Sequence, residues 1–129
     1  MNRQTFMSAA AAISVVTGLG ALLAGSQLAA VFGVKLDDVG LSQTRLLGAA
    51  YLGYAAIAWF GRDVRDNAAQ RAIALGNLVS WALSLAVSIA AVVIGLAGTQ
   101  SWLAVALEAV FTAGWAYFAF LDRAEFAPA

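Results

Sequence analysis

Glu108 is the one ionisable residue deep inside a long apolar run of this 129-residue chain. It lies seven positions after Ser101, about 10 Å along a helix that rises 1.5 Å per residue. An isolated carboxylate in hydrocarbon is costly, so such a group faces other helices, finds a partner or stays protonated. Intramembrane ionisable residues are also candidates for function. Glu108 is therefore the first candidate site residue.

Arg45 offers Glu108 a partner of opposite charge at a similar depth in another apolar stretch. We predict that the two side chains contact each other directly or through one water, as a structural bridge that sets helix register. A second interpretation is a functional carboxylate in a small ligand or proton site, supported by Asn77, Tyr51 or Thr112. In a third, Glu108 is protonated and hydrogen-bonded to a neighbouring backbone or hydroxyl group.

Other catalytic chemistry finds little support in the composition. The chain has no histidine and no cysteine, which excludes imidazole acid–base chemistry and thiolate or imidazole metal ligands. A serine nucleophile needs a base to activate it, and no histidine or membrane-embedded lysine is present. We therefore predict no catalytic residues, no metal, no cofactor and no enzymatic activity.

The elements that carry these residues are four apolar stretches separated by short polar gaps. Each is close to the ~20 residues that an α-helix needs to cross a bilayer. Hydrophobic residues make up 63% of the chain and charged residues 11%, against about a quarter charged in soluble domains. The sequence predicts an all-α, polytopic membrane protein: a four-helix transmembrane bundle in a single domain, 1–129, with Ser42 capping the second helix. The predicted helices are 5–32, 42–61, 68–97 and 101–122.

The first stretch also has features of a signal peptide, with a basic start at Arg3 and small residues around Gly25. Its apolar run continues past Ser26 and Gln27, where we expect a break into a short interfacial turn. We therefore predict a retained first helix.

The basic residues predict the orientation. Four crossings place five of them on one side, namely Arg3, Arg62, Arg65, Arg71 and Arg123, and leave Lys35 and Arg45 on the other. Basic residues near short loops favour the cytoplasm, so both termini are expected there, in a bacterial inner (plasma) membrane. Because seven basic and seven acidic residues cancel, no nucleic-acid partner is expected.

Small residues recur on the helix faces and predict where helices pack. In lipid, helices associate through close contact of small residues. The third stretch carries a stripe spaced by four, and the first two carry looser patterns; these residues are Gly76, Ser80, Ser84 and Ser88, then Gly18, Ala49 and Gly53. We predict that the third helix is buried against its neighbours. The alternative is a polar substrate groove along the serines.

Three features of the chain together resemble a known class of membrane proteins. They are the segment Arg45-Leu46-Leu47-Gly48-Ala49 at the start of the second helix, a charged loop after Trp59 and a glutamate in the fourth helix. The chain resembles small bacterial four-helix membrane proteins of a domain-of-unknown-function class, and more loosely small membrane subunits of the DoxX type. The third helix departs from some members, with Asn77 and serines where they have an arginine. The resemblance implies topology and no mechanism.

Three functions remain open from the sequence. The first is a non-enzymatic membrane protein that acts by helix association, as an accessory subunit or a self-assembling bundle, with membrane lipids and a homo-oligomer or membrane-protein partner around it. The second is a small transporter or channel subunit. The third is a binder of lipid or another apolar ligand, using Glu108 and the polar face of the third helix, near Trp81, Trp115 and the tyrosines.

Overall fold

The computed structural model describes residues 2–121. This part of the chain consists of helices joined by short turns and loops and contains no strand. The all-α prediction is confirmed. The helices are α1 Arg3–Leu23, α2 Gly25–Val31, α3 Asp38–Gly61, α4 Asn67–Val93 and α5 Trp102–Ala116, with a 3-10 turn at Thr99–Ser101 and a π-helical turn at Tyr117–Leu121. The predicted end of the fourth helix at Asp122 lies outside the described residues.

Three helical segments are long and apolar enough to cross a membrane: Arg3–Leu23, Asn67–Val93 and Thr99–Leu121. The fourth long helix, α3, is 24 residues long but is less apolar. Gln43, Thr44 and Arg45 lie near its start and Tyr51 and Tyr54 at its centre, and all five lower its mean hydropathy. On length and hydropathy, the chain is therefore a membrane protein with three candidate spans.

Three predicted helix boundaries are wrong. The third predicted helix, 68–97, ends at Val93. The first stretch breaks at Ala24, whose φ of −137° and ψ of 39° leave the helical region, rather than at Ser26 and Gln27. The N-cap of α3 is Asp37, whose Oδ1 accepts a hydrogen bond from the Gly40 amide at 2.7 Å. An ionised carboxylate near a helix N-terminus also interacts favourably with the helix dipole. Ser42 consequently lies inside α3.

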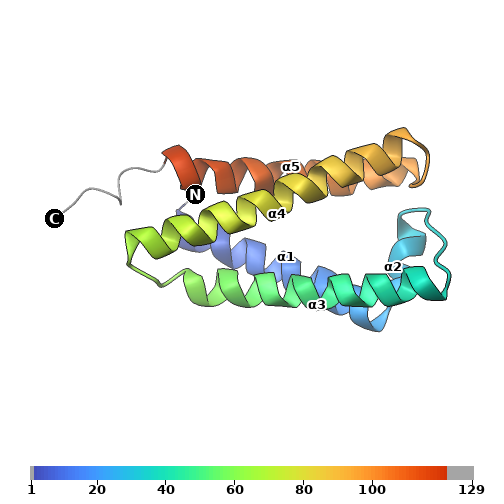
Figure 1. Cartoon of the computed structure of the whole chain (residues 1–129), viewed down its shortest axis with the longest axis horizontal. Helices are drawn as coiled ribbons and strands as arrows, with labels where there is room; N and C mark the ends of the chain where they lie inside the picture. The colour runs from blue at the N-terminus through green and yellow to red at the C-terminus, as the bar shows by residue number, and fades with distance from the viewer. Residues whose placement is uncertain (1, 122–129) are drawn as a thin grey trace.

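The long helices form two pairs, α1 with α3 and α4 with α5 (Figure 1). The chain reverses direction between successive long helices, so the N-terminus lies near the loop that joins α3 to α4 (Figure 1). Gln4 connects the two segments, since its Nε2 donates to Asp63 Oδ1 at 3.2 Å. Gln70 holds the same loop: it is buried, and its Nε2 donates to the carbonyl oxygens of Gly61 and Val64 at 2.7 and 2.5 Å.

Small residues bring α1 and α3 into backbone contact. A Cβ added at Gly18 would lie 2.9 Å from the Gly48 carbonyl oxygen, and one at Gly48 would lie 2.8 Å from the Gly18 carbonyl oxygen. The other predicted packing positions differ. Ala49 is exposed, and a Cβ at Gly53 or Gly76 would meet nothing within 4 Å. The prediction of close packing at these three residues is wrong.

The prediction that the third helix is buried is also wrong, because α4 is the least buried of the three apolar segments. Its packed face consists of Gln70, Ala74, Asn77 and Trp81. The stripe of Ser80, Ser84 and Ser88 is only half-buried beside this face. Trp81 and Ala74, rather than the serine stripe, belong to the buried core of the bundle.

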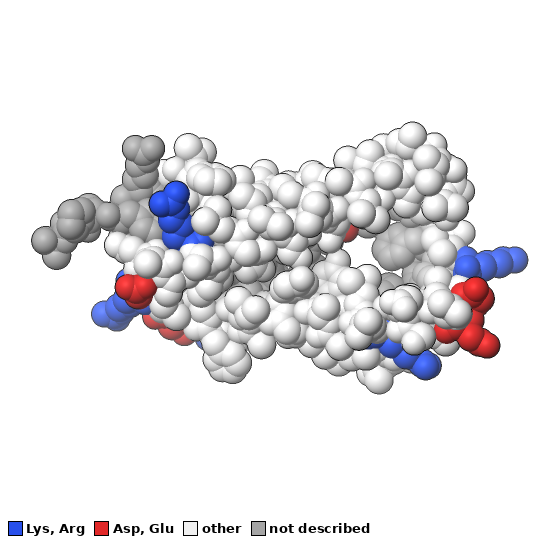
Figure 2. Space-filling model, viewed as in Figure 1, with Lys and Arg blue, Asp and Glu red and all other residues white. Residues whose placement is uncertain are grey.

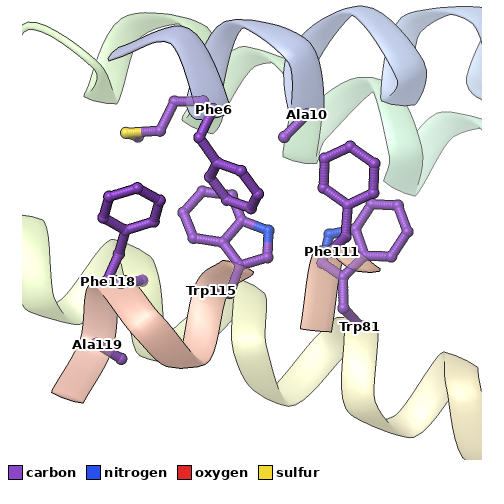
Figure 3. Packing of buried hydrophobic residues seen from close by; sticks show 9 residues of the cluster. Phe6, Ala10, Trp81, Phe111, Trp115, Phe118 and Ala119 are labelled. Carbon is purple, nitrogen blue, oxygen red and sulfur yellow. The ribbon is translucent and has the colours of Figure 1, made fainter. Parts of the chain in front are cut away.

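An aromatic cluster joins the two helix pairs at the end that carries the N-terminus (Figure 3). The Phe6 ring of α1 lies 5.5, 5.0 and 5.1 Å from those of Phe111, Trp115 and Phe118, and Phe111 stacks on Trp81 at 4.8 Å. At the opposite end, the Phe32 carbonyl accepts hydrogen bonds from the Gly98 amide and the Ser101 hydroxyl, at 2.9 and 3.3 Å. The two pairs are thus connected at both ends.

Charged side chains gather at the two ends of the molecule (Figure 2). The surface between them is uncharged on this face, apart from one acidic side chain at the edge of a hollow between the helix pairs (Figure 2). An uncharged band between two charged ends is the pattern expected of a protein whose middle lies in hydrocarbon.

Candidate functional site

A cavity of about 660 Å³ lies between the two helix pairs. Most of its lining comes from α1, α2 and α5, and one side is closed by residues of α3 and by Trp81 of α4. The lining side chains are mostly aliphatic or aromatic, with Thr17, Thr44, Tyr51 and Glu108 as the polar members. We call this space the apolar cavity.

A second cavity, of about 580 Å³, lies between α3 and α4. The half-buried serine stripe of α4 lines it, together with Tyr54 and Gly76. We call this space the serine cavity. The serines therefore form a groove, which was the alternative interpretation of their spacing, and do not form a helix-packing seam.

The two cavities meet at four residues that line both: Leu47, Tyr51, Trp81 and Glu108. Periodicity explains the meeting point on α3, because Thr44, Leu47 and Tyr51 are spaced i, i+3 and i+7 and share one helix face. On α5, the buried face consists of Val105, Glu108, Phe111 and Trp115. Glu108 thus faces the bundle, as its sequence position predicts.

The Glu108 side chain is buried, with 9% of the residue exposed. Its Oε2 has no hydrogen-bond partner among the described residues, while Ser88 of α4 lies beside the carboxyl group. Thr112 Oγ1 and Trp115 Nε1 are buried without a partner as well. Residues 108, 112 and 115 are spaced i, i+4 and i+7, so one face of α5 presents three unpaired polar atoms. Unpaired buried polar groups are rare and call for an explanation.

The predicted bridge from Arg45 to Glu108 is not formed. Arg45 is exposed, and within residues 2–121 the structure shows an ion pair only between Arg62 and Asp63, at 3.4 Å. Arg45 follows Thr44, which lines the apolar cavity, and one residue rotates a helix by about 100°. The guanidinium group therefore points away from the cavity. The functional-site and protonated interpretations of Glu108 stay predictions.

The other predicted site residues have different surroundings. Tyr51 lines both cavities, and its ring lies edge-on to those of Trp81 and Tyr54, with centroids 6.4 and 6.3 Å away. Asn77 is buried, but its Nδ2 donates to the Ile73 carbonyl of its own helix at 2.9 Å, and it lines neither cavity. Thr112 shares the face of Glu108 one turn along α5 and lines neither cavity.

Thr17 and Thr44 line the apolar cavity and were not predicted as site residues. Tyr54, which lines the serine cavity, was expected near a ligand only as one of the tyrosines. It lies three positions after Tyr51, on the same side of α3, and residues so spaced are neighbours on a helix surface. This spacing was the available signal.

A scan against protein-family models and searches of curated proteins and of solved structures found no match for the chain. The resemblance to small bacterial four-helix membrane proteins stays a prediction.

Proposed function

We propose that this chain is a four-span, non-enzymatic membrane protein that binds a small, largely apolar molecule between its two helix pairs. The proposal makes α3 the fourth span. Its support is the backbone contact between α1 and α3 at Gly18 and Gly48, which keeps α3 alongside an apolar helix. Arg45 lies in the second turn of α3, where a long basic side chain can reach the aqueous interface.

The proposed location is a bacterial inner membrane with both termini in the cytoplasm. The N-terminus and the loop after α3 lie together, joined by Gln4 and Asp63. This end carries Arg3, Arg62, Arg65 and Arg71, against Lys35 and Arg45 at the other, and such an excess favours the cytoplasmic side. Arg123, which was also counted toward this side, lies outside the described residues.

The observation that carries the binding proposal is the buried carboxyl group of Glu108, whose Oε2 has no hydrogen-bond partner among the described residues, beside an apolar cavity of about 660 Å³. Ligand sites typically occupy ~300–1,000 Å³ and combine apolar walls with a few polar groups that orient the ligand. A buried polar atom without a partner costs about 1–3 kcal/mol. A bound molecule with a matching polar group removes that cost, and its apolar part fills the cavity.

Binding of 1-aminoanthracene, a small apolar dye whose fluorescence rises in dry surroundings, tests the proposal on the detergent-purified chain. Ala104 lines the apolar cavity, whereas Ala109 on the same helix is exposed and does not. We expect the wild type and Ala109→Phe to bind the dye and Ala104→Phe to bind it much more weakly. Equal binding to the two variants would show that this cavity is not the site.

Helix association is a second candidate function, as an accessory subunit or a self-assembling bundle. The observation that favours it is the outward position of Ala49 and Gly53 on α3, where a neighbouring helix can approach closely. Native mass spectrometry of the gently extracted protein tests this idea. It predicts an oligomer or a bound membrane protein that Gly53→Leu dissociates, and a monomer in the wild type would count against it.

A further inference from the structure

We infer that the bound molecule is a hydrophobic organic cation, a positively charged group carrying apolar substituents. This inference rests on the proposed function and adds the chemical class of the ligand. It starts from the charges that line the two cavities. Glu108 is the only acidic residue that lines the two cavities, and no lysine or arginine lines either one. A ligand with a matching charge is therefore a cation.

The chain's own basic side chains do not neutralise this carboxylate. The one nearest in predicted depth, Arg45, is exposed on a different face of α3, and the blue side chains in Figure 2 lie at the ends of the molecule. A charge buried without a partner is strongly disfavoured. A cationic ligand supplies the missing partner. Its binding free energy is therefore more favourable than that of a neutral molecule of the same shape.

Aromatic rings surround the same point. Tyr51 and Trp81 line both cavities beside Glu108, and Tyr54 lines the serine cavity. Tryptophan and tyrosine faces attract cations within about 6 Å, and the attraction is stronger in dry surroundings. Serine and tyrosine hydroxyl oxygens add dipoles that can turn toward a positive group. A carboxylate among such rings favours a cation with diffuse charge over a strongly hydrated metal ion.

Both cavities can be reached from the side of the bundle that faces lipid. The apolar cavity is bordered by Leu103 and Val110 of α5, which are 77% and 64% exposed, and the serine cavity by Leu83 and Val87 of α4, which are 63% and 69% exposed. A ligand with apolar substituents dissolves in the membrane and can enter between these residues. The geometry therefore favours a hydrophobic cation over a water-soluble one.

Tetraphenylphosphonium and tetraphenylborate test the inference because they have nearly the same shape and opposite charge. Isothermal titration calorimetry measures their binding to the detergent-purified full chain. We expect the wild type to bind tetraphenylphosphonium at least about tenfold more tightly than tetraphenylborate, a difference of about 1.4 kcal/mol. Glu108→Gln should remove most of this preference and Glu108→Asp should retain part of it. Asp38→Asn, which removes an exposed carboxylate that lines neither cavity, should leave it unchanged.

Binding of the neutral dye 1-aminoanthracene distinguishes a failure of the cation inference from a failure of the cavity proposal. If the dye binds but the wild type does not prefer the phosphonium ion, or Glu108→Gln keeps the preference, the ligand is not a cation and the cavity proposal stands. If neither the dye nor the phosphonium ion binds the wild type, the cavity proposal itself is wrong. The wild-type comparison of the two ions decides the point even if the Glu108 variants fail to fold.

Discussion

At the residue scale, the environment of Glu108 differs from that of every other acidic residue the structure describes. Asp37 and Asp66 cap helices and Asp63 pairs with Arg62, whereas Glu108 is buried beside two cavities with one oxygen unpaired. Carboxylates that serve a fold usually have partners. The unpaired Oε2 of Glu108 therefore favours a role in binding.

Neutralising Arg45 or Glu108 should therefore do little harm to the fold. We expect Arg45→Gln to change the free energy of unfolding by no more than about 0.5 kcal/mol, as is usual at exposed positions. Glu108→Gln should leave it unchanged or raise it, because an amide is cheaper to bury than an unpaired carboxylate. Thermal unfolding in detergent measures both. A loss of about 3–5 kcal/mol in each variant would indicate a buried ion pair after all.

Gln70 should matter more for stability than either charge. Its amide donates to the Gly61 and Val64 carbonyls at the loop between α3 and α4. Gln70→Leu leaves the Val64 carbonyl unpaired, whereas the Gly61 carbonyl still accepts from the Val64 amide at 3.2 Å. We expect a loss of about 1–3 kcal/mol in the free energy of unfolding. Gln43→Leu makes the same replacement at an exposed position of α3 and should change little. Equal effects would show that the loop does not depend on these hydrogen bonds.

The sequence shows which residues carry chemistry but not all of their partners. The depth of Glu108 follows from counting residues along a helix, and Tyr51 was correctly linked to it. The rotation of α3 about its axis, which turns Arg45 outward, depends on the contact of Gly18 with Gly48 and cannot be obtained from depth or charge.

At the element scale, the contact between α1 and α3 determines how the first helix pair forms. The carbonyl oxygen of each glycine would lie less than 3 Å from a Cβ added to the other, at 2.9 and 2.8 Å, and a backbone cannot move aside as a flexible side chain can. The two glycines thus allow the helix axes to approach closely.

Two alanine substitutions on α3 test this contact. Gly48→Ala forces the helices apart, and we expect a loss of about 1–3 kcal/mol in the free energy of unfolding, as in other overpacked sites. Gly53→Ala is the control, because its Cβ meets nothing within 4 Å and alanine gains up to about 1 kcal/mol of helix propensity. Comparable losses in both variants would contradict the assigned contact between α1 and α3.

Small residues alone did not identify the packed faces. Gly18 lies in a tight contact whereas Gly76, in the more regular stripe of α4, faces open space. Small residues four positions apart occur both where two helices pack together and where a helix lines a groove. The difference arises because bulky Trp81 and Phe111 stack on each other and fill the contact that a seam of serines would have made.

At the scale of the whole molecule, the helix pairs are joined by the aromatic cluster at one end and by Phe32 at the other. The apolar stretches of the sequence predict the four long helices and their approximate ends, although three segments, without α3, are apolar enough to cross a membrane. The cavities could not be predicted this way, since they arise from how far the pairs stand apart between the two joined ends.

The proposed topology can be checked with single cysteines, because the chain has none of its own. Lys35→Cys and Arg65→Cys introduce thiols at exposed positions at opposite ends of α3. In intact cells, with the outer membrane made permeable, a membrane-impermeant maleimide should label position 35. Position 65 should react only after the inner membrane is opened. The reverse pattern would invert the orientation, and labelling of both from one side would exclude α3 as a span.

The central claim is that Glu108 lines a cavity inside the membrane that apolar molecules can reach. Labelling of membranes with carbodiimides, followed by mass spectrometry of the modified residues, tests it most directly. We predict that apolar dicyclohexylcarbodiimide modifies Glu108, whereas a water-soluble carbodiimide modifies Asp37, Asp38, Asp63 and Asp66 but not Glu108. Modification of Glu108 by the water-soluble reagent, or by neither reagent, would contradict the account.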